Sequence, residues 1–87
     1  MRHNRYFNFT SSMRPQNAQI GDIITLELVE NYSRKELTLE TTVGYREDFP
    51  CSTQLKGRIM MDGHHYNIEI NLNQNHPQKD FVVLIET

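Results

Sequence analysis

The dipeptide Asp62-Gly63 constrains the fold of this chain most, because it lies between two segments of alternating polarity, 54–61 and 64–72. Both of its residues tolerate the positive φ angles that a two-residue type I′ hairpin turn requires. Counting outward from such a turn fixes which residues face each other across the two strands. The dipeptide therefore predicts a β-hairpin with a defined register.

The predicted hairpin has one apolar side and one polar side. The pairs on the apolar side are Met61 with His64, Ile59 with Tyr66, Gly57 with Ile68, and Leu55 with Ile70. The pairs on the polar side are Met60 with His65, Arg58 with Asn67, and Lys56 with Glu69. A lysine opposite a glutamate stabilises such a ladder. The turn and the hydrophobic pattern agree on one register, which indicates an antiparallel β architecture.

Two further alternating segments, 23–30 and 36–45, predict a second hairpin. A four-residue loop between them places Leu28 opposite Leu37, so that like faces meet. A helix over 34–42 is the competing interpretation, because Lys, Glu and Leu are good helix formers. The β-branched residues that follow favour the strand.

The remaining segments predict one more strand and three connections. Residues 6–10 alternate, with Phe7 and Phe9 on one face, and predict a strand. Connections are expected at 13–21, at 46–52 around Pro50, and at 73–79 around Pro77. Proline at 50 is expected to break the chain there, because it cannot donate a hydrogen bond to a ladder.

A short run near the C-terminal end, 81–85, is apolar on both faces and predicts a strand in the middle of a sheet or against another subunit. We expect Phe81, Val83 and Ile85 to fill the core. Val82 and Leu84 then need cover on the opposite face. A second copy of the chain would provide that cover, so the sequence predicts a homodimer through the C-terminal strand.

Together these segments predict an all-β fold of five to six strands. The architecture expected is a small antiparallel β-barrel, SH3-like or OB-like, or a compact sandwich. At 87 residues the chain is expected to form a single β-domain, 1–87, with a thin core. Its N-terminal segment, 1–21, is basic, with three arginines and no acidic residue, although the net charge of the chain is −2.

The sequence also predicts a cytoplasmic protein with no membrane partner. Its single cysteine, Cys51, cannot form an intramolecular disulfide, which is typical of a reducing compartment. The N-terminal residues lack the apolar stretch of a signal peptide. The longest apolar run has five residues, 81–85, whereas a membrane span needs about 20.

No catalytic residue, metal ligand or cofactor is predicted. His64 and His65 are adjacent on a strand, so their side chains point to opposite faces and cannot share one ion without distortion. Cys51 has no second cysteine to complete a zinc site. The chain also lacks a nucleophile elbow and a phosphate-binding glycine loop. We therefore expect a protein that is not an enzyme and acts by binding.

Two binding surfaces are predicted, each for a different partner. A protein partner is expected on the polar side of the first hairpin, where methionine, arginine and amides suit protein recognition. The candidate residues there are Arg58, Met60, His65, Asn67 and Glu69. The alternative is single-stranded RNA or DNA, because arginines attract phosphate and bases stack on aromatic rings. The candidate residues for that role lie in the basic segment and are Arg2, Arg5, Tyr6 and Arg14.

The sequence thus favours a small non-catalytic binding protein, an inhibitor, adaptor or assembly subunit, that acts through a protein–protein interface. Accessory proteins of phages and other mobile elements are often of this kind, an analogy at the level of size and class alone. A single-stranded nucleic-acid binder is the second hypothesis.

Overall fold

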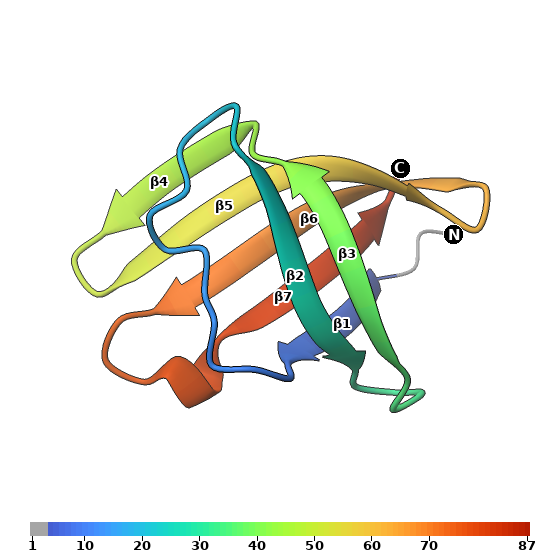
Figure 1. Cartoon of the computed structure of the whole chain (residues 1–87), viewed down its shortest axis with the longest axis horizontal. Coiled ribbons are helices and arrows are strands. Elements are labelled where there is room, and N and C mark those ends of the chain that lie inside the picture. The colour runs from blue at the N-terminus through green and yellow to red at the C-terminus, as the bar shows by residue number, and fades with distance from the viewer. Residues whose placement is uncertain (1–3) are drawn as a thin grey trace.

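The computed structural model describes residues 4–87 and shows one curled sheet of seven antiparallel strands (Figure 1). In chain order the elements are β1 (Asn4–Phe9), β2 (Ile23–Glu30), β3 (Glu36–Thr42), β4 (Tyr45–Phe49), β5 (Ser52–Met61), β6 (His64–Asn73), the short 3-10 helix η1 (Pro77–Lys79) and β7 (Phe81–Glu86). The order of strands in the sheet is β3-β2-β1-β7-β6-β5-β4. The predicted all-β class is confirmed, with one strand more than expected.

The sheet curls into a half-barrel whose two ends lie over each other. In Figure 1, β2 and β3 cross over β5, β6 and β7, and the core lies between these two layers. Strand β1 joins the layers, since its first half pairs with β7 and its second half pairs with β2. The largest side chains of the core are Phe7, Leu26, Leu28, Leu55, Ile68, Ile70 and Leu84.

The hairpin of β5 and β6 has the register predicted from the sequence. Met61 pairs with His64, and the pairing continues to Ser52 and Asn73. Asp62 and Gly63 have φ angles of 54° and 78°, as a type I′ turn requires. The predicted turn is therefore confirmed.

Replacing Gly63 by Val is expected to destabilise the protein by about 1–2 kcal/mol, because a β-branched side chain is strained at positive φ. A thermal melt measures the effect. Gly63→Asn is the matched control and should melt close to the wild type, because Asn tolerates this conformation. Equal melting temperatures for the Val and Asn variants would contradict the turn.

The second predicted hairpin is also present. Leu28 pairs with Leu37 and Leu26 with Leu39, so the helix considered for 34–42 does not form. The chain leaves this hairpin earlier than expected, because β3 ends at Thr42 and Tyr45 begins a new strand.

The break expected at 46–52 was wrong, because most of it is strand β4. Phe49 pairs with Ser52, so Pro50 and Cys51 form a two-residue turn between β4 and β5. Proline is tolerated there because a turn residue donates no ladder hydrogen bond. The proline therefore marks a turn between two strands, not the end of the sheet.

Strand β7 lies between β1 and β6, in the middle of the sheet as predicted. Its two faces are the reverse of the expectation. Val82 and Leu84 are the core residues, both 0% exposed, whereas on the other face Phe81 is 37% exposed and Val83 alone is buried, at 6%. A strand that is apolar at every position carries no alternation, so the sequence pattern could not decide which face turns inward.

The two layers meet where β3 crosses β5 at Gly57. The hydroxyl of Thr41 donates a hydrogen bond to the carbonyl of Arg58 at 3.0 Å. A Cβ atom at Gly57 would lie 2.6 Å from both Thr41 Oγ1 and the Thr42 carbonyl oxygen. Glycine is therefore required for this close approach of the two backbones.

Candidate functional site

Strands β4, β5, β6, β7 and β1 turn one side away from the core, and we call this side the outer face. Residues paired across neighbouring strands lie on the same side of a sheet, so the pairing register defines its members. They include Tyr6, Tyr45, Glu47, Phe49, Gln54, Lys56, Arg58, Met60, His65, Asn67, Glu69, Asn71, Phe81, Val83 and Ile85. Residues that alternate with them, such as Leu55 and Ile70, are buried in the core.

Large apolar side chains gather on the outer face. Of the nine that are exposed among residues 4–87, five belong to it: Tyr6, Tyr45, Phe49, Met60 and Phe81. The others lie in loops or at the start of β2. Met60 is the most exposed of the five, at 67%. Exposed apolar side chains concentrated on one surface are typical of an interaction site.

One row of side chains runs across all five strands of the outer face, and we call it the central row. It consists of Tyr45, Lys56, Glu69, Val83 and Tyr6, each paired with the next. The ammonium of Lys56 lies 4.8 Å from the centre of the Tyr45 ring, a cation–π contact. Lys56 faces Glu69 as predicted, but within residues 4–87 no carboxylate oxygen lies within 4.0 Å of its ammonium.

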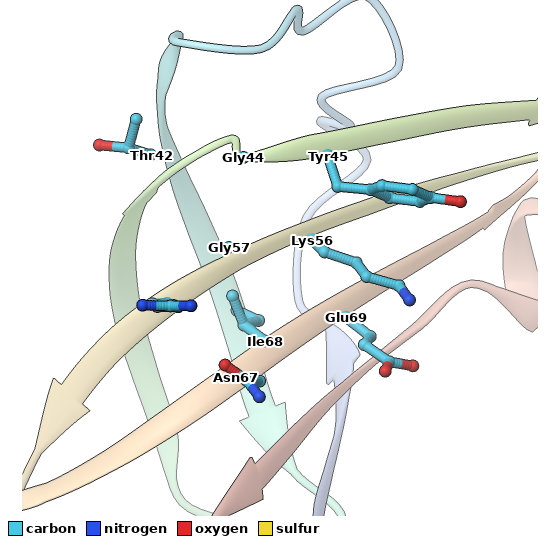
Figure 2. A pocket seen from close by; sticks show the side chains of 9 residues that line it. Thr42, Gly44, Tyr45, Lys56, Gly57, Asn67, Ile68 and Glu69 are labelled. Carbon is cyan, nitrogen blue, oxygen red and sulfur yellow. The ribbon is translucent and has the colours of Figure 1, made fainter. Parts of the chain in front are cut away.

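A hollow of about 560 Å³ opens beside the central row. Figure 2 shows Tyr45, Lys56 and Glu69 extending to the same side from three neighbouring strands. The end of β3 and the β3–β4 corner, at Thr42 and Gly44, form the wall of the hollow. It is lined by Thr42, Gly44, Tyr45, Lys56, Gly57, Arg58, Asn67, Ile68 and Glu69.

The five residues predicted to bind a protein lie together on the outer face. Arg58, Asn67 and Glu69 line the hollow. Met60 and His65 form the next pair toward the hairpin tip, and both are exposed. The sequence therefore placed these side chains on one surface, and their role in binding stays a prediction.

Tyr45 and Phe81 were missed as outer-face residues. Tyr45 was expected to end the strand over 36–45, because the turn at Val43 and Gly44 has no strong sequence signal. The Tyr45 hydroxyl donates a hydrogen bond to the Glu47 carboxylate, which raises the pKa of the tyrosine. The neutral phenol is thereby favoured at this end of the central row.

The nucleic-acid candidates are distributed differently. Arg5, predicted to contact phosphate, is engaged within the protein. Its guanidinium is half-buried and bonds Glu30 through two nitrogens, each at 2.9 Å. It also lies 5.8 Å from the ring centre of Phe7. Arg2 lies outside the described residues, and Tyr6 is exposed on the outer face.

Arg14 is also engaged within the protein. Its Nε donates to Asp80 at 2.8 Å, and the Asp80 side chain is only 2% exposed. The guanidinium lies 4.1 Å from the ring centre of Phe9. An arginine held by a buried carboxylate and an aromatic ring is not available to a phosphate without breaking that ion pair. The structure therefore brings together the protein-binding candidates, whereas it holds two of the nucleic-acid candidates, Arg5 and Arg14, in ion pairs.

The Arg5–Glu30 pair should make stability depend on pH. The bonds from the Arg5 guanidinium lower the pKa of Glu30 below its ordinary value of 4.5. A carboxyl whose folded-state pKa is lowered stabilises the fold above its unfolded-state pKa, and this contribution is lost as the pH falls through the folded-state value. The gap in unfolding free energy between wild type and Glu30→Gln should thus be constant near pH 7 and shrink below about pH 4.5. Urea titrations from pH 7 to pH 3 measure it, and a gap that does not change with pH would contradict this role.

Neither a cluster of metal-binding side chains nor a membrane-spanning helix occurs among residues 4–87. No group of three or more His, Cys, Asp or Glu side chains in this part of the chain is placed to hold a metal ion. The thiol of Cys51 is exposed in the β4–β5 turn. Within the described residues, no helix has the length and apolar character needed to cross a bilayer.

Comparison with known proteins adds no assignment: no protein-family model, no curated protein and no solved structure matches this chain.

Proposed function

We propose that this protein is a non-catalytic binding module that recognises another protein through its outer face, as an inhibitor, adaptor or assembly subunit. The observation that carries the proposal is the gathering of five of the nine large exposed apolar side chains on this one face. One of them, Tyr45, lines the hollow next to the central row.

The chemistry of the outer face supports this proposal. Tyrosine, methionine and arginine are enriched in protein interfaces, where aromatic and arginine side chains often contribute most of the binding energy. Tyr45 and Tyr6 end the central row, and Arg58 and Met60 lie beside it. The charged groups of the face have both signs, with Lys56 and Arg58 near Glu47 and Glu69. Such a mixed surface suits a protein partner better than a polyanion.

Site-specific photo-crosslinking tests the proposal. A photoreactive phenylalanine analogue replaces Tyr45 in one variant and Thr38 in a matched control. Thr38 lies on the outward side of β3, beyond the outer face. Each variant is illuminated in the lysate of its native cell, with and without nuclease. We expect a discrete protein adduct from position 45 that survives nuclease and is absent from position 38.

Three results would count against the proposal. Adducts of equal yield from both positions would indicate nonspecific contact. An adduct lost on nuclease treatment would indicate a nucleic acid. No adduct from position 45, with adducts from position 38, would place the partner on the other layer.

Binding to nucleic acid is expected to be weak. With Arg5 and Arg14 held by carboxylates, a labelled single-stranded oligonucleotide should bind no more tightly than about micromolar at physiological salt. Fluorescence anisotropy at several salt concentrations measures this. Tighter binding, with log affinity that falls linearly with log salt, would make the single-stranded RNA or DNA binder the better hypothesis.

One outcome of the crosslinking is an adduct with a second copy of the chain, which would indicate a homodimer. A homodimer would form through the outward side of β7, where Phe81 is exposed and Ile85 is partly buried. Sedimentation at tens of micromolar distinguishes monomer from dimer.

We also propose that the protein is cytoplasmic, because a single exposed thiol such as Cys51 persists in a reducing compartment.

A further inference from the structure

The β5–β6 hairpin has one covered edge and one open edge. On the β6 side, β7 pairs as far as Tyr66, and the Thr87 amide donates to the His65 carbonyl at 3.1 Å. On the β5 side, β4 pairs only with Ser52 to Lys56. In the described part of the chain no strand pairs with the β5 edge from Gly57 to Met61, although the end of β3 lies against Gly57 and the Thr41 hydroxyl bonds the Arg58 carbonyl. In Figure 1 this end of the hairpin extends beyond the crossing of β3.

The register shows which backbone groups line the open edge. Successive residues of an antiparallel strand direct their backbone groups to opposite edges. The carbonyls of Lys56 and Arg58 point away from β6, because they accept hydrogen bonds from the Gly44 amide at 2.8 Å and the Thr41 hydroxyl at 3.0 Å. The amide of Arg58 and both backbone groups of Met60 therefore also point to the open edge.

The side chains at the open edge are also without partners. Arg58 is exposed, and among residues 4–87 its guanidinium makes no hydrogen bond or ion pair. Arg5, Arg14 and Arg46, by contrast, each bond a carboxylate. Met60, on the same side, is largely exposed. An open edge thus carries one cationic and one apolar side chain at alternate positions.

We propose that the open edge of β5 binds an extended segment of the partner protein, which adds to the sheet as a further strand in line with β4. This inference rests on the proposed function and specifies how the partner binds. The segment carries an acidic residue beside Arg58 and an apolar residue beside Met60, two positions apart, since alternate residues of a strand share one face. A second copy of β5 fits this edge less well, because two-fold pairing would bring two unpaired arginines close together.

A linear peptide library displayed on phage supplies the probe. The full chain is the target, and selected peptides are measured by fluorescence anisotropy. We expect an acidic and an apolar residue at alternate positions in the selected sequences. Arg58→Glu should weaken binding at least tenfold, whereas Lys79→Glu in η1, a matched change of charge away from this edge, should not.

A proline at position 60 separates strand addition from side-chain contact. Met60→Pro removes the edge amide and the side chain, and Met60→Ala removes the side chain alone. Proline is tolerated at a sheet edge whose amide faces solvent, so both variants should fold. We expect Met60→Pro to bind about tenfold more weakly than Met60→Ala, which corresponds to one lost hydrogen bond.

Amide hydrogen exchange tests the same edge without any variant. In the unbound protein the amides of Arg58 and Met60, which point to the open edge, should exchange faster than those of Gly57, Ile59 and Met61, which point toward β6. Bound peptide should slow both. Failure to select any peptide, or protection confined to other residues, would overturn the inference. Neither result affects the crosslink expected at position 45, which tests the outer face separately.

Discussion

Leu84→Asp is expected to unfold the protein. The Leu84 side chain is 0% exposed and lies in the core between the two layers of the half-barrel. Truncating such a leucine costs about 2–5 kcal/mol, and a buried carboxylate without a partner adds several more. The sum approaches the roughly 5–15 kcal/mol by which a typical domain is stable. Circular dichroism should show loss of the β-sheet signal at 25 °C.

Phe81→Asp is the matched control for that change. Phe81 lies on the same strand but on the outer face, where it is partly exposed. The variant should keep its β-sheet spectrum, and any homodimer through β7 should dissociate. A folded Leu84→Asp protein, or an unfolded Phe81→Asp protein, would contradict the assignment of the two faces of β7.

Gly57→Ala is expected to cost about 2–3 kcal/mol, although alanine usually suits a strand better than glycine. The new methyl group would lie 2.6 Å from the Thr41 hydroxyl and from the Thr42 carbonyl. Relief requires β3 to move away from β5, which breaks the bond between the Thr41 hydroxyl and the Arg58 carbonyl. Urea denaturation measures the change in unfolding free energy.

Gly44→Ala is the matched control for the effect of Gly57→Ala on the contact between β3 and β5. A Cβ atom at Gly44 would meet only the Lys56 carbonyl, at an ordinary contact distance of 3.8 Å. Its effect should stay within about 1 kcal/mol. Equal stability of the Gly57→Ala variant and the wild-type protein would show that the layers separate at this point without cost.

The local features of the fold were predictable because short-range chemistry determines them. Asp62-Gly63 specified a turn, and the register from Met61 to Leu55 followed by counting. The predictions that were wrong concern residues whose sequence pattern fits two structures. Pro50 fits a break or a turn, and the wholly apolar run 81–85 of β7 fits either orientation.

The candidate site was predictable only in part, for a different reason. The outer-face residues of β5 and β6 follow from alternation within one hairpin, so Arg58, Met60 and Glu69 were placed correctly. The partners of Arg5 and Arg14 are Glu30 and Asp80, which are distant in sequence. No local pattern reports such a pairing, so the sequence alone left these arginines free for phosphate.

The position of β1 and β7 at the centre of the sheet has a consequence for how the chain folds. Strands β2 and β3 form one hairpin, and β4, β5 and β6 form a run of two more, so both groups assemble from neighbours in sequence. Within the sheet they are joined through the pairing of β1 with β7, which closes a loop of almost the entire chain. The entropy of closing that loop must be overcome before the core is complete, so we expect this contact to limit the rate at which the domain reaches its native state.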